Sequence, residues 1–187
     1  MKKIVEGELL WTPGPARLAR SHLTRYLAWL AARGRKFENY DGLWRWSVTD
    51  LPGFWQTMVE FCGLEFSTPA SQVLGRREMP GAEWFPGSRL NYAAHALRHE
   101  RDGEDALLHL SERRPLASMS WREFARQVRV LATFMRALGI APGDRVVAYL
   151  PNTPEALVAM YATASIGAVW SSCGPDFGAR GVLDRYA

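Results

Sequence analysis

The fold is decided by residues 145–172, RVVAYLPNTPEALVAMYATASIGAVWSS. Both ends of this stretch, 145–150 and 168–172, are short apolar runs that predict buried strands. Between them, the turn and proline pattern at 151–155 opens a predicted helix. A strand, a helix and a second strand in this order favour a parallel α/β sheet.

A long helix is predicted before the first of these strands. Ser120 and Glu123 form the pattern of a capping box, and the amphipathic run behind it ends at Gly139. A Pro-Gly-Asp turn at 142–144 then leads into the strand. Ligands of open parallel sheets bind at the carboxyl ends of the strands, so the candidate site lies at 151–153 and 173–177.

The first 88 residues predict a mainly helical, Trp-rich region that lacks a sheet of its own. Apolar residues recur at helical spacing from 18 to 30, and Gly34 supplies a C-terminal stop. Residues 37–46 predict an irregular aromatic segment. We expect the tryptophans of this region to pack in the core or between domains, because their large faces need burial.

A second helix and a connection complete this first region. Ser47 or Asp50 caps a short predicted helix that ends at Gly63. Residues 64–88 show no periodicity and contain several prolines and glycines, which predicts an extended surface connection or an arm that wraps another domain. We therefore expect a first domain over residues 1–88.

A second domain is expected over residues 89–187. A short helix at 91–98 and a short strand at 106–110 precede a hairpin-like turn at 112–115, which leads to the long helix. Two or three parallel strands fit between residues 106 and 172, fewer than a complete doubly wound sheet contains. We favour an incomplete α/β domain, a partial parallel sheet with flanking helices, over self-association through an exposed sheet edge.

Composition excludes several classes of protein. The chain is 48% hydrophobic and 22% charged, which is typical of a globular protein and not of a disordered one. Its net charge of +4 comes from scattered arginines without dense basic blocks, so nucleic acid is not expected as a partner. No apolar run reaches the ~20 residues of a membrane-spanning helix, and no signal-peptide pattern is present. Cys62 and Cys173 lie far apart, so we expect reduced thiols in a cytoplasmic chain without a membrane partner.

Short motifs predict no catalytic residue and no metal ligand. The sequence lacks both glycine-rich phosphate loops, the Gly-x-Ser-x-Gly elbow and the His-Glu-x-x-His pattern. His95 and His99 lie four residues apart on a predicted helix without a third ligand, so surface positions are favoured over a metal site. Ser171, Ser172 and Cys173 follow a strand, but no neighbouring base accompanies them.

Several longer patterns resemble one enzyme family. YDGLWRWSV at 40–48 and EWFPGSRLNYA at 83–93 resemble the N-terminal extension of acyl-CoA synthetases of the acetate and acetoacetate type. GDRVVAYLPN at 143–152 and ASIGAVWSS at 164–172 are similar to the first two core motifs of adenylate-forming enzymes. The Pro-Asp-Phe-Gly turn at 175–178 resembles the acetoacetate–CoA ligases, whereas acetate enzymes carry a Phe-Gly-Gly-Phe-like turn there.

The resemblance implies the N-terminal fragment of an acetoacetate–CoA ligase, with residues 89–187 as the truncated first part of its AMP-binding (adenylation) domain. In that family a carboxylate attacks the α-phosphate of ATP, which gives an acyl-adenylate and pyrophosphate, and the CoA thiolate then displaces AMP. The implied cofactors of the full-length enzyme are ATP, CoA and Mg²⁺, and its implied small-molecule substrates are acetoacetate and CoA. The family's phosphate loop, metal-binding acids and C-terminal lysine do not occur in this sequence, so we expect the fragment to be inactive alone and to bind no cofactor tightly.

The resemblance implies one candidate cofactor-binding segment in this chain. Gly174, Pro175, Asp176 and Phe177 correspond to the family's turn on the CoA side, where Phe177 would pack on CoA and backbone N–H groups would meet phosphate. Gly174 departs from the pattern, because a serine is expected there. The alternative is an ordinary strand-to-helix turn capped by Asp176.

Two other identities stay open at the level of the sequence. One is a fragment of an acetyl- or propionyl-CoA synthetase, because the acyl pocket of the family is mostly encoded downstream of this region. The other is a non-catalytic binding or interaction module that uses the open edge of its sheet.

Overall fold

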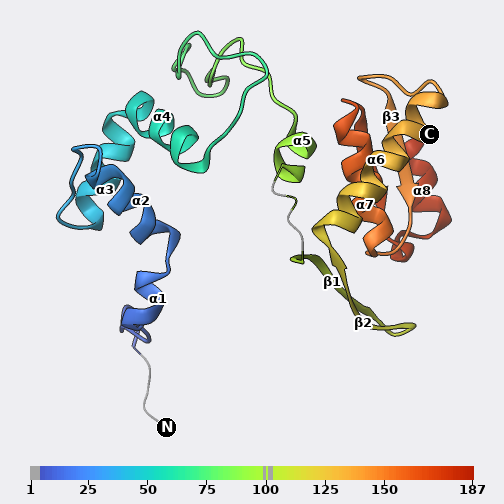
Figure 1. Cartoon of the computed structure of the whole chain (residues 1–187), viewed down its shortest axis with the longest axis horizontal. Helices are drawn as coiled ribbons and strands as arrows, with labels where there is room; N and C mark the ends of the chain where they lie inside the picture. The colour runs from blue at the N-terminus through green and yellow to red at the C-terminus, as the bar shows by residue number, and fades with distance from the viewer. Residues whose placement is uncertain (1–4, 99, 101–102) are drawn as a thin grey trace. The chain divides into compact units, whose positions relative to one another are not determined.

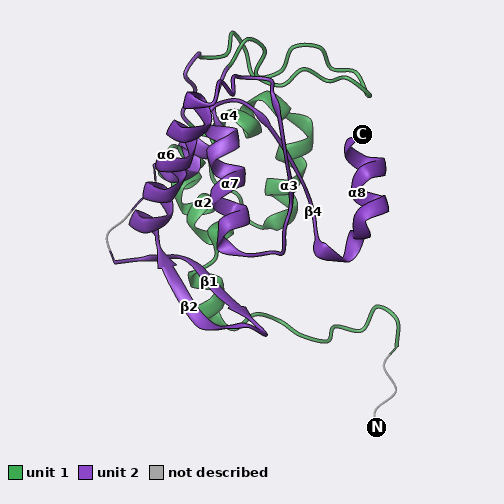
Figure 2. Ribbon diagram, turned by 90° about the vertical axis from the view of Figure 1, so that its right-hand side faces the viewer, with its two compact units in different colours: residues 1–64, 69–88 green, residues 65–68, 89–187 purple. Residues whose placement is uncertain are grey.

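The computed structural model describes residues 5–98, 100 and 103–187. Figure 1 shows the helices and strands in chain order. The chain divides into two compact units (Figure 2). Unit 1 consists of Met1–Leu64 with Pro69–Ser88, and unit 2 of Glu65–Thr68 with Arg89–Ala187.

Unit 1 is built from helices. It contains α1 (Pro15–Ala19), α2 (His22–Ala31), α3 (Tyr40–Thr49) and α4 (Leu51–Cys62). Tyr26 and Leu30 of α2 and Leu43 and Trp46 of α3 form its buried core, and Phe54 of α4 packs against them. The hydroxyl groups of Tyr26 and Thr57 lie 2.6 Å apart and tie α2 to α4.

The predicted first helix is divided in two. The Ser21 side chain accepts a hydrogen bond from the Thr24 backbone N–H at 3.0 Å, so a new helix, α2, begins after it. Gly34 follows α2 with a φ of +84°, which is the stop that the sequence predicts.

The prediction of an irregular segment over residues 37–46 is wrong, because α3 begins at Tyr40. The Asn39 side chain caps α3 by accepting a hydrogen bond from the Gly42 backbone N–H at 2.9 Å. Trp46 is buried, and its indole N–H donates to Asp50 Oδ2 at 2.9 Å. Capping by Asn39 and burial of Leu43 and Trp46 therefore stabilise a helix that the local sequence pattern does not predict.

The second helix and the connection follow the sequence predictions. Asp50 caps α4 by accepting a hydrogen bond from the Gly53 N–H at 3.0 Å, and Gly63 ends the helix with a φ of +58°. Residues 64–88, all of them described, contain no helix and no named strand. An isolated antiparallel bridge joins Leu74 and Trp84.

Unit 2 contains the α/β part of the chain. Its elements are α5 (Tyr92–Leu97), β1 (Asp105–Ser111), β2 (Arg114–Ser120), α6 (Trp121–Ala137), β3 (Arg145–Tyr149), α7 (Pro154–Ser165), β4 (Val169–Cys173), the 3₁₀ turn η1 (Pro175–Phe177) and α8 (Gly178–Tyr186). β3 and β4 pair in parallel, from Arg145 opposite Val169 to Tyr149 opposite Cys173. The predicted strand–helix–strand unit is confirmed, and Ser120 caps α6 as predicted by accepting from the Glu123 N–H at 3.2 Å.

Helices lie on both faces of the parallel pair. On one face, Val146 packs against the core that α6 and α7 form together. On the other face, the Cys173 thiol donates to the Tyr186 hydroxyl of α8, which donates to Ser171 Oγ, each at 3.4 Å. Figure 2 shows β4 between α7 and α8.

One predicted strand lies outside the parallel sheet. β1 pairs antiparallel with β2, a strand that the sequence analysis does not predict. The predicted turn at 112–115 is shorter, because Ser111 Oγ accepts the Arg114 N–H at 3.0 Å and β2 begins at once. Pro115 is tolerated near the start of β2, since a two-stranded hairpin leaves one edge of each strand without ladder bonds. Of the two or three expected parallel strands, the described residues form the pair β3 and β4.

Candidate functional site

The carboxyl ends of β3 and β4 lie side by side because the two strands are parallel. The pairing continues one residue further, where the Leu150 N–H donates to the Cys173 carbonyl oxygen at 3.2 Å. Beyond this point the chain leaves β3 through residues 151–153 into α7 and leaves β4 through Gly174 into η1. The two segments predicted to face a ligand, 151–153 and 173–177, therefore lie together at the carboxyl end of the sheet.

The candidate turn at Gly174–Phe177 is a single 3₁₀ turn. The Phe177 N–H donates to the Gly174 carbonyl oxygen at 3.2 Å, and Pro175 occupies the first helical position. Gly174 and Phe177 are the N-cap residues of η1 and α8, and neither cap has a side-chain hydrogen bond. Asp176 occupies neither cap position, so the alternative in which Asp176 caps the following helix is wrong.

The neighbouring Asp176 side chain explains why position 174 has a glycine. Its backbone is extended, with a φ of −75°, so no unusual conformation requires glycine. A Cβ at this position would lie 2.5 Å from Asp176 Oδ1, because the Asp176 side chain folds back over it. The serine expected from the family pattern would therefore require the Asp176 carboxylate to rotate away.

Tyr149 fixes the turn to the end of the neighbouring strand. Its hydroxyl donates to the Pro175 carbonyl oxygen at 2.9 Å. Sequence reasoning places Tyr149 in the strand but misses this role. The available signal was its position at the carboxyl end of a strand predicted to be parallel to the strand before the turn.

The Phe177 ring is half exposed at the same edge, with the Arg185 guanidinium 6.0 Å from its centre. An exposed ring can pack on an aliphatic or planar ligand, and a guanidinium pairs well with phosphate. The pair Phe177 and Arg185 therefore offers complementary contacts to a ligand that has both an apolar chain and phosphate groups. Sequence reasoning identified Phe177 but not Arg185.

An ion pair between Arg114 and Glu155 lies near the carboxyl end of β3. Arg114 Nη1 lies 2.9 Å and 3.1 Å from the two carboxylate oxygens of Glu155, in the first turn of α7. Hydrogen bonds from the Thr153 side chain, the Glu155 backbone N–H and Arg114 lower the pKa of Glu155 to about 2. Glu155 is therefore ionised at neutral pH and compensates the charge of Arg114 at this end of the sheet.

The other described residues considered as nucleophiles or metal ligands do not come together in one site. Ser171 and Cys173 share the Tyr186 hydroxyl, and Cys62 is exposed in unit 1. His95 lies half-buried on α5, whereas His99 is outside the described residues, so the structure gives no account of that pair. Across the part of the chain that is described, no group of three or more His, Cys, Asp or Glu residues could hold a metal ion. None of the described helices is both long and apolar enough to cross a bilayer.

Comparison with known proteins connects this arrangement to one family. Residues 40–96 match the profile of the acetyl-coenzyme A synthetase N-terminus, and residues 97–185 match that of the AMP-binding enzymes. The acetoacetyl-CoA synthetase of Macaca fascicularis is 41% identical over the whole chain, and that of Rhizobium meliloti (strain 1021) is 40% identical over 95% of it. The solved structure of acetoacetyl-CoA synthetase from Streptomyces lividans matches 96% of the chain with 51% identity and a TM-score of 0.88. The chain belongs to the acyl-CoA synthetase family.

The similarity to these acyl-CoA synthetases covers the N-terminal portion of each relative. The chain spans 28% of the length of the Macaca protein and of the Streptomyces chain, and 27% of the Rhizobium protein. The resemblance drawn from the patterns at 40–48, 83–93, 143–152 and 164–172 is confirmed, as is the α/β fold class.

Proposed function

We propose that this chain is the N-terminal portion of an acetoacetate–CoA ligase. The enzyme would convert ATP, acetoacetate and CoA into acetoacetyl-CoA, AMP and pyrophosphate by way of an acyl-adenylate. The observation that carries the proposal is the 51% identity and 0.88 TM-score to the Streptomyces lividans acetoacetyl-CoA synthetase over 96% of the chain. Residues 1–88 would form the N-terminal extension and residues 89–187 the first part of the adenylation domain, in a cytoplasmic enzyme.

Within this enzyme we assign the turn Gly174, Pro175, Asp176 and Phe177 to the CoA side of the site. The half-exposed Phe177 ring and the nearby Arg185 fit a cofactor that combines an aliphatic pantetheine arm with phosphates. Tyr149 would hold the turn in place through its 2.9 Å hydrogen bond to Pro175.

The other cofactors of the reaction would be held elsewhere in the enzyme. The described residues offer no cluster of acids that fits Mg²⁺, so we assign no Mg²⁺ ligand to this chain. ATP binding and the chemical steps would likewise depend on the part of the enzyme that the chain does not match. We therefore expect the chain to be inactive alone.

A chimera tests this proposal directly. The 187-residue chain replaces the matched N-terminal 28% of the Streptomyces lividans enzyme. With ATP, Mg²⁺ and acetoacetate the chimera is expected to release pyrophosphate, and on addition of CoA to form acetoacetyl-CoA. The 187-residue chain alone is expected to release none.

Three results would contradict the proposal. Pyrophosphate release by the chain alone would show that the catalytic groups lie within it. A folded chimera that activates acetate or propionate in preference to acetoacetate would favour a different acyl-CoA synthetase. A folded chimera without any adenylation activity would favour a non-catalytic module.

A further inference from the structure

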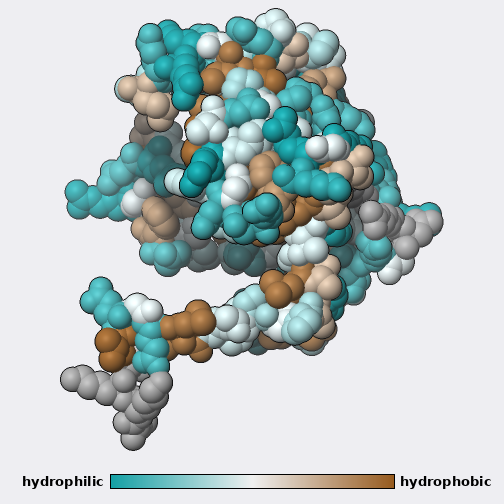
Figure 3. Space-filling model, turned by 90° about the vertical axis from the view of Figure 1, so that its left-hand side faces the viewer, coloured by the Kyte–Doolittle hydropathy of each residue, from teal (hydrophilic) through white to brown (hydrophobic). Residues whose placement is uncertain are grey.

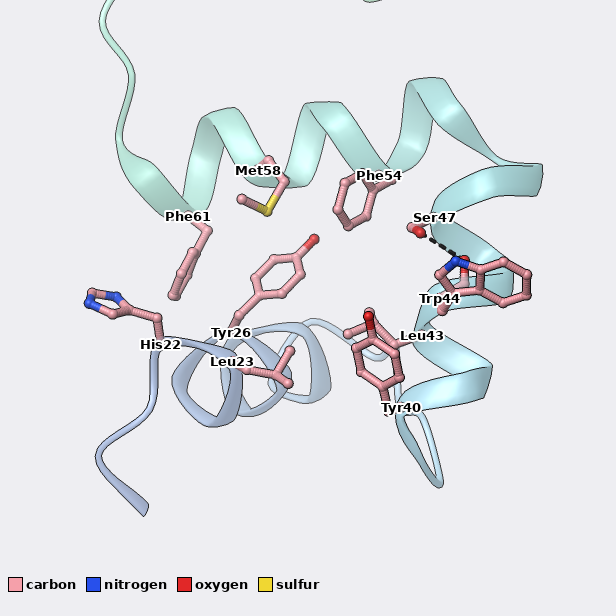
Figure 4. A pocket seen from close by; sticks show the side chains of 10 residues that line it. All are labelled: His22, Leu23, Tyr26, Tyr40, Leu43, Trp44, Ser47, Phe54, Met58 and Phe61. Atoms are coloured by element: carbon pink, nitrogen blue, oxygen red, sulfur yellow. Dashed lines mark hydrogen bonds between the residues drawn. The ribbon is translucent and has the colours of Figure 1, made fainter. Parts of the chain in front are cut away.

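Apolar exposure alone does not identify a ligand on this chain. In unit 1, exposed apolar residues follow the segment that leads to the N-terminus, where Figure 3 shows them in brown. Apolar side chains of α2, α3 and α4 also line a pocket of about 320 Å³ (Figure 4), but acidic and basic residues balance around it, so its charge selects no partner. The turn at the end of β4 differs, because the exposed ring of Phe177 has an arginine beside it.

The charge of this arginine, Arg185, is not neutralised by an acid. Among the described residues Arg185 makes no ion pair, whereas Arg180 of the same helix has its Nε 4.0 Å from Asp184 Oδ2. The Arg185 guanidinium lies 6.0 Å from the centre of the Phe177 ring and 5.9 Å from the centre of the Tyr186 ring. It is therefore available to pair with an anion such as a phosphate group.

Tyr186, the neighbour of Arg185 in the sequence, joins α8 to β4. Its hydroxyl accepts a hydrogen bond from the Cys173 thiol and donates one to Ser171 Oγ, each at 3.4 Å. Cys173 is 2% exposed, so the hydroxyl reaches a buried part of the strand. Successive side chains of a helix point about 100° apart, which lets Tyr186 face the strand while Arg185 faces the Phe177 ring.

The ring and the guanidinium follow one face of α8. A Cβ at Gly181 would lie 3.7 Å from Phe177 Cδ1, so the ring lies along the first turn of the helix. Phe177, Gly181 and Arg185 are successively four residues apart, which places them on the same side. A movement of α8 away from β4 would therefore displace the ring and the guanidinium together.

We propose that Tyr186 is a positioning residue of the CoA site. Its hydroxyl fixes α8 on β4 and thereby holds the Arg185 guanidinium, beside the Phe177 ring, where a phosphate group of CoA binds. The identity of the ligand rests on the proposed function. Tyr149 holds the start of the turn, and Tyr186 adds a second anchor that acts on the charged contact.

The first test measures CoA kinetics in the chimera. Tyr186→Phe removes only the hydroxyl and should raise KM for CoA about 3–10-fold, while CoA-independent pyrophosphate exchange changes by less than about twofold. Arg185→Gln should raise the same KM about 10-fold or more, because it removes a charge-assisted contact. In the Arg185→Gln background Tyr186→Phe should have no further effect on this KM, since the hydroxyl acts through the guanidinium.

Pantetheine separates positioning of the charge from a general loss of structure. This thiol lacks every phosphate of CoA, so with pantetheine as the acceptor Tyr186→Phe should change the rate by less than about twofold. Arg180→Gln is the matched charge control, because the Arg180 side chain is 97% exposed and lies about 140° around the helix from Arg185. Tyr40→Phe is the hydroxyl control, since Tyr40 is 62% exposed in unit 1 (Figure 4). Both controls should leave KM for CoA unchanged.

The anchoring contact can also be tested in the 187-residue chain alone, which covers a chimera that does not fold. In a Cys62→Ser background Cys173 is the remaining cysteine of the sequence. Tyr186→Phe should raise the rate at which the Cys173 thiol reacts with an aromatic disulfide reagent about 3–10-fold, because α8 opens more often. Tyr40→Phe should leave this rate unchanged.

Several outcomes would overturn the proposal. They are an unchanged KM for CoA in Tyr186→Phe, an equal loss with CoA and with pantetheine, and an undiminished effect of Tyr186→Phe in the Arg185→Gln background. An unchanged reaction rate of the Cys173 thiol would show that the hydroxyl does not hold α8. Acetoacetate-dependent pyrophosphate exchange by the unsubstituted chimera tests the proposed function separately, so that the two failures are distinguished.

Discussion

At the scale of single residues, Asp50 holds two helices of unit 1 together. Its carboxylate accepts hydrogen bonds from the Trp46 indole N–H at 2.9 Å and from the Gly53 backbone N–H at 3.0 Å. Asp50→Ala removes the cap of α4 and leaves the N–H of a buried tryptophan without this acceptor. We expect a loss of about 1–3 kcal/mol in the free energy of unfolding, measured by denaturant titration with tryptophan fluorescence. A loss below about 0.5 kcal/mol would contradict this role.

Asp50 also gives unit 1 a defined pH dependence. The hydrogen bonds from Trp46 and from Gly53 lower the pKa of Asp50 below its ordinary value of 3.8. A lowered pKa means that the stabilisation is complete above the ordinary pKa and is lost as the pH falls through the lower, folded-state value. Asp50→Asn keeps a capping oxygen but cannot titrate, so Tm of this variant should fall less steeply than that of the wild type below about pH 4. Parallel Tm curves for the two proteins would show that other carboxylates dominate.

Tyr149 is the residue through which the candidate CoA turn can be tested. Tyr149→Phe removes only the hydroxyl that donates to Pro175. In the chimera we expect KM for CoA to rise about 3–10-fold, the equivalent of one lost hydrogen bond, while acetoacetate-dependent pyrophosphate exchange stays within about twofold. Tyr92→Phe is the control, since the Tyr92 hydroxyl lies 3.4 Å from that of Tyr161 on a different contact. An equal fall of both activities in Tyr149→Phe would mean that the hydroxyl supports the fold and not the turn.

At the scale of elements, the cap of α6 controls the largest helix of unit 2. Ser120 Oγ accepts the Glu123 N–H, while the Glu123 carboxylate accepts from Arg126 Nε at 2.8 Å and Arg126 Nη2 at 2.7 Å. These bonds, together with one from Gln127, lower the pKa of Glu123 to about 2. Ser120→Ala should cost about 1 kcal/mol of unfolding free energy, whereas Ser120→Asp, which retains a cap, should cost less than about 0.5 kcal/mol. The two variants are compared by denaturant titration, and equal losses would exclude capping as the cause.

The elements that the sequence predicts correctly carry their signals locally. α6 has a capping box and an apolar stripe, and β3, α7 and β4 alternate with turn residues between them. The two elements that were missed depend on distant contacts. α3 contains Gly42 and β-branched residues and forms because Leu43 and Trp46 become buried against α2 and α4. β2 contains Pro115 and becomes a strand only through pairing with β1.

The candidate site also combines a feature with a local sequence signal and a feature that depends on contacts between distant residues. The location of the turn at 174–177 follows from the position of a predicted strand end, which is a local signal. The contact between Tyr149 and Pro175 joins residues 26 apart, and it exists only because β3 and β4 are parallel and in one register. Spacing along the chain cannot specify such a register, so the residue that fixes the turn becomes visible only in the fold.

At the scale of the whole molecule, the chain displays apolar surface that a globular protein normally covers. The hairpin β1–β2 shows this most clearly, since Leu108, Leu110 and Leu116 are each about 70% exposed. Leu108 and Leu110 are two residues apart on β1 and therefore point to the same face. An apolar face of this kind promotes association of the chain with itself when nothing else covers it.

We therefore expect the 187-residue chain to associate with increasing concentration, and Leu108→Lys with Leu110→Lys to reduce this association at little cost in Tm, because both side chains are already exposed. Sedimentation velocity over a concentration series measures the effect. Gln56→Lys with Gln72→Lys adds the same two positive charges at exposed polar positions in unit 1 and should leave the association unchanged. If this glutamine pair is as effective as the leucine variants, net charge and not the hairpin face controls association. If neither acts, the open edges of β3 and β4 become the favoured contact, since that surface is unchanged in every variant.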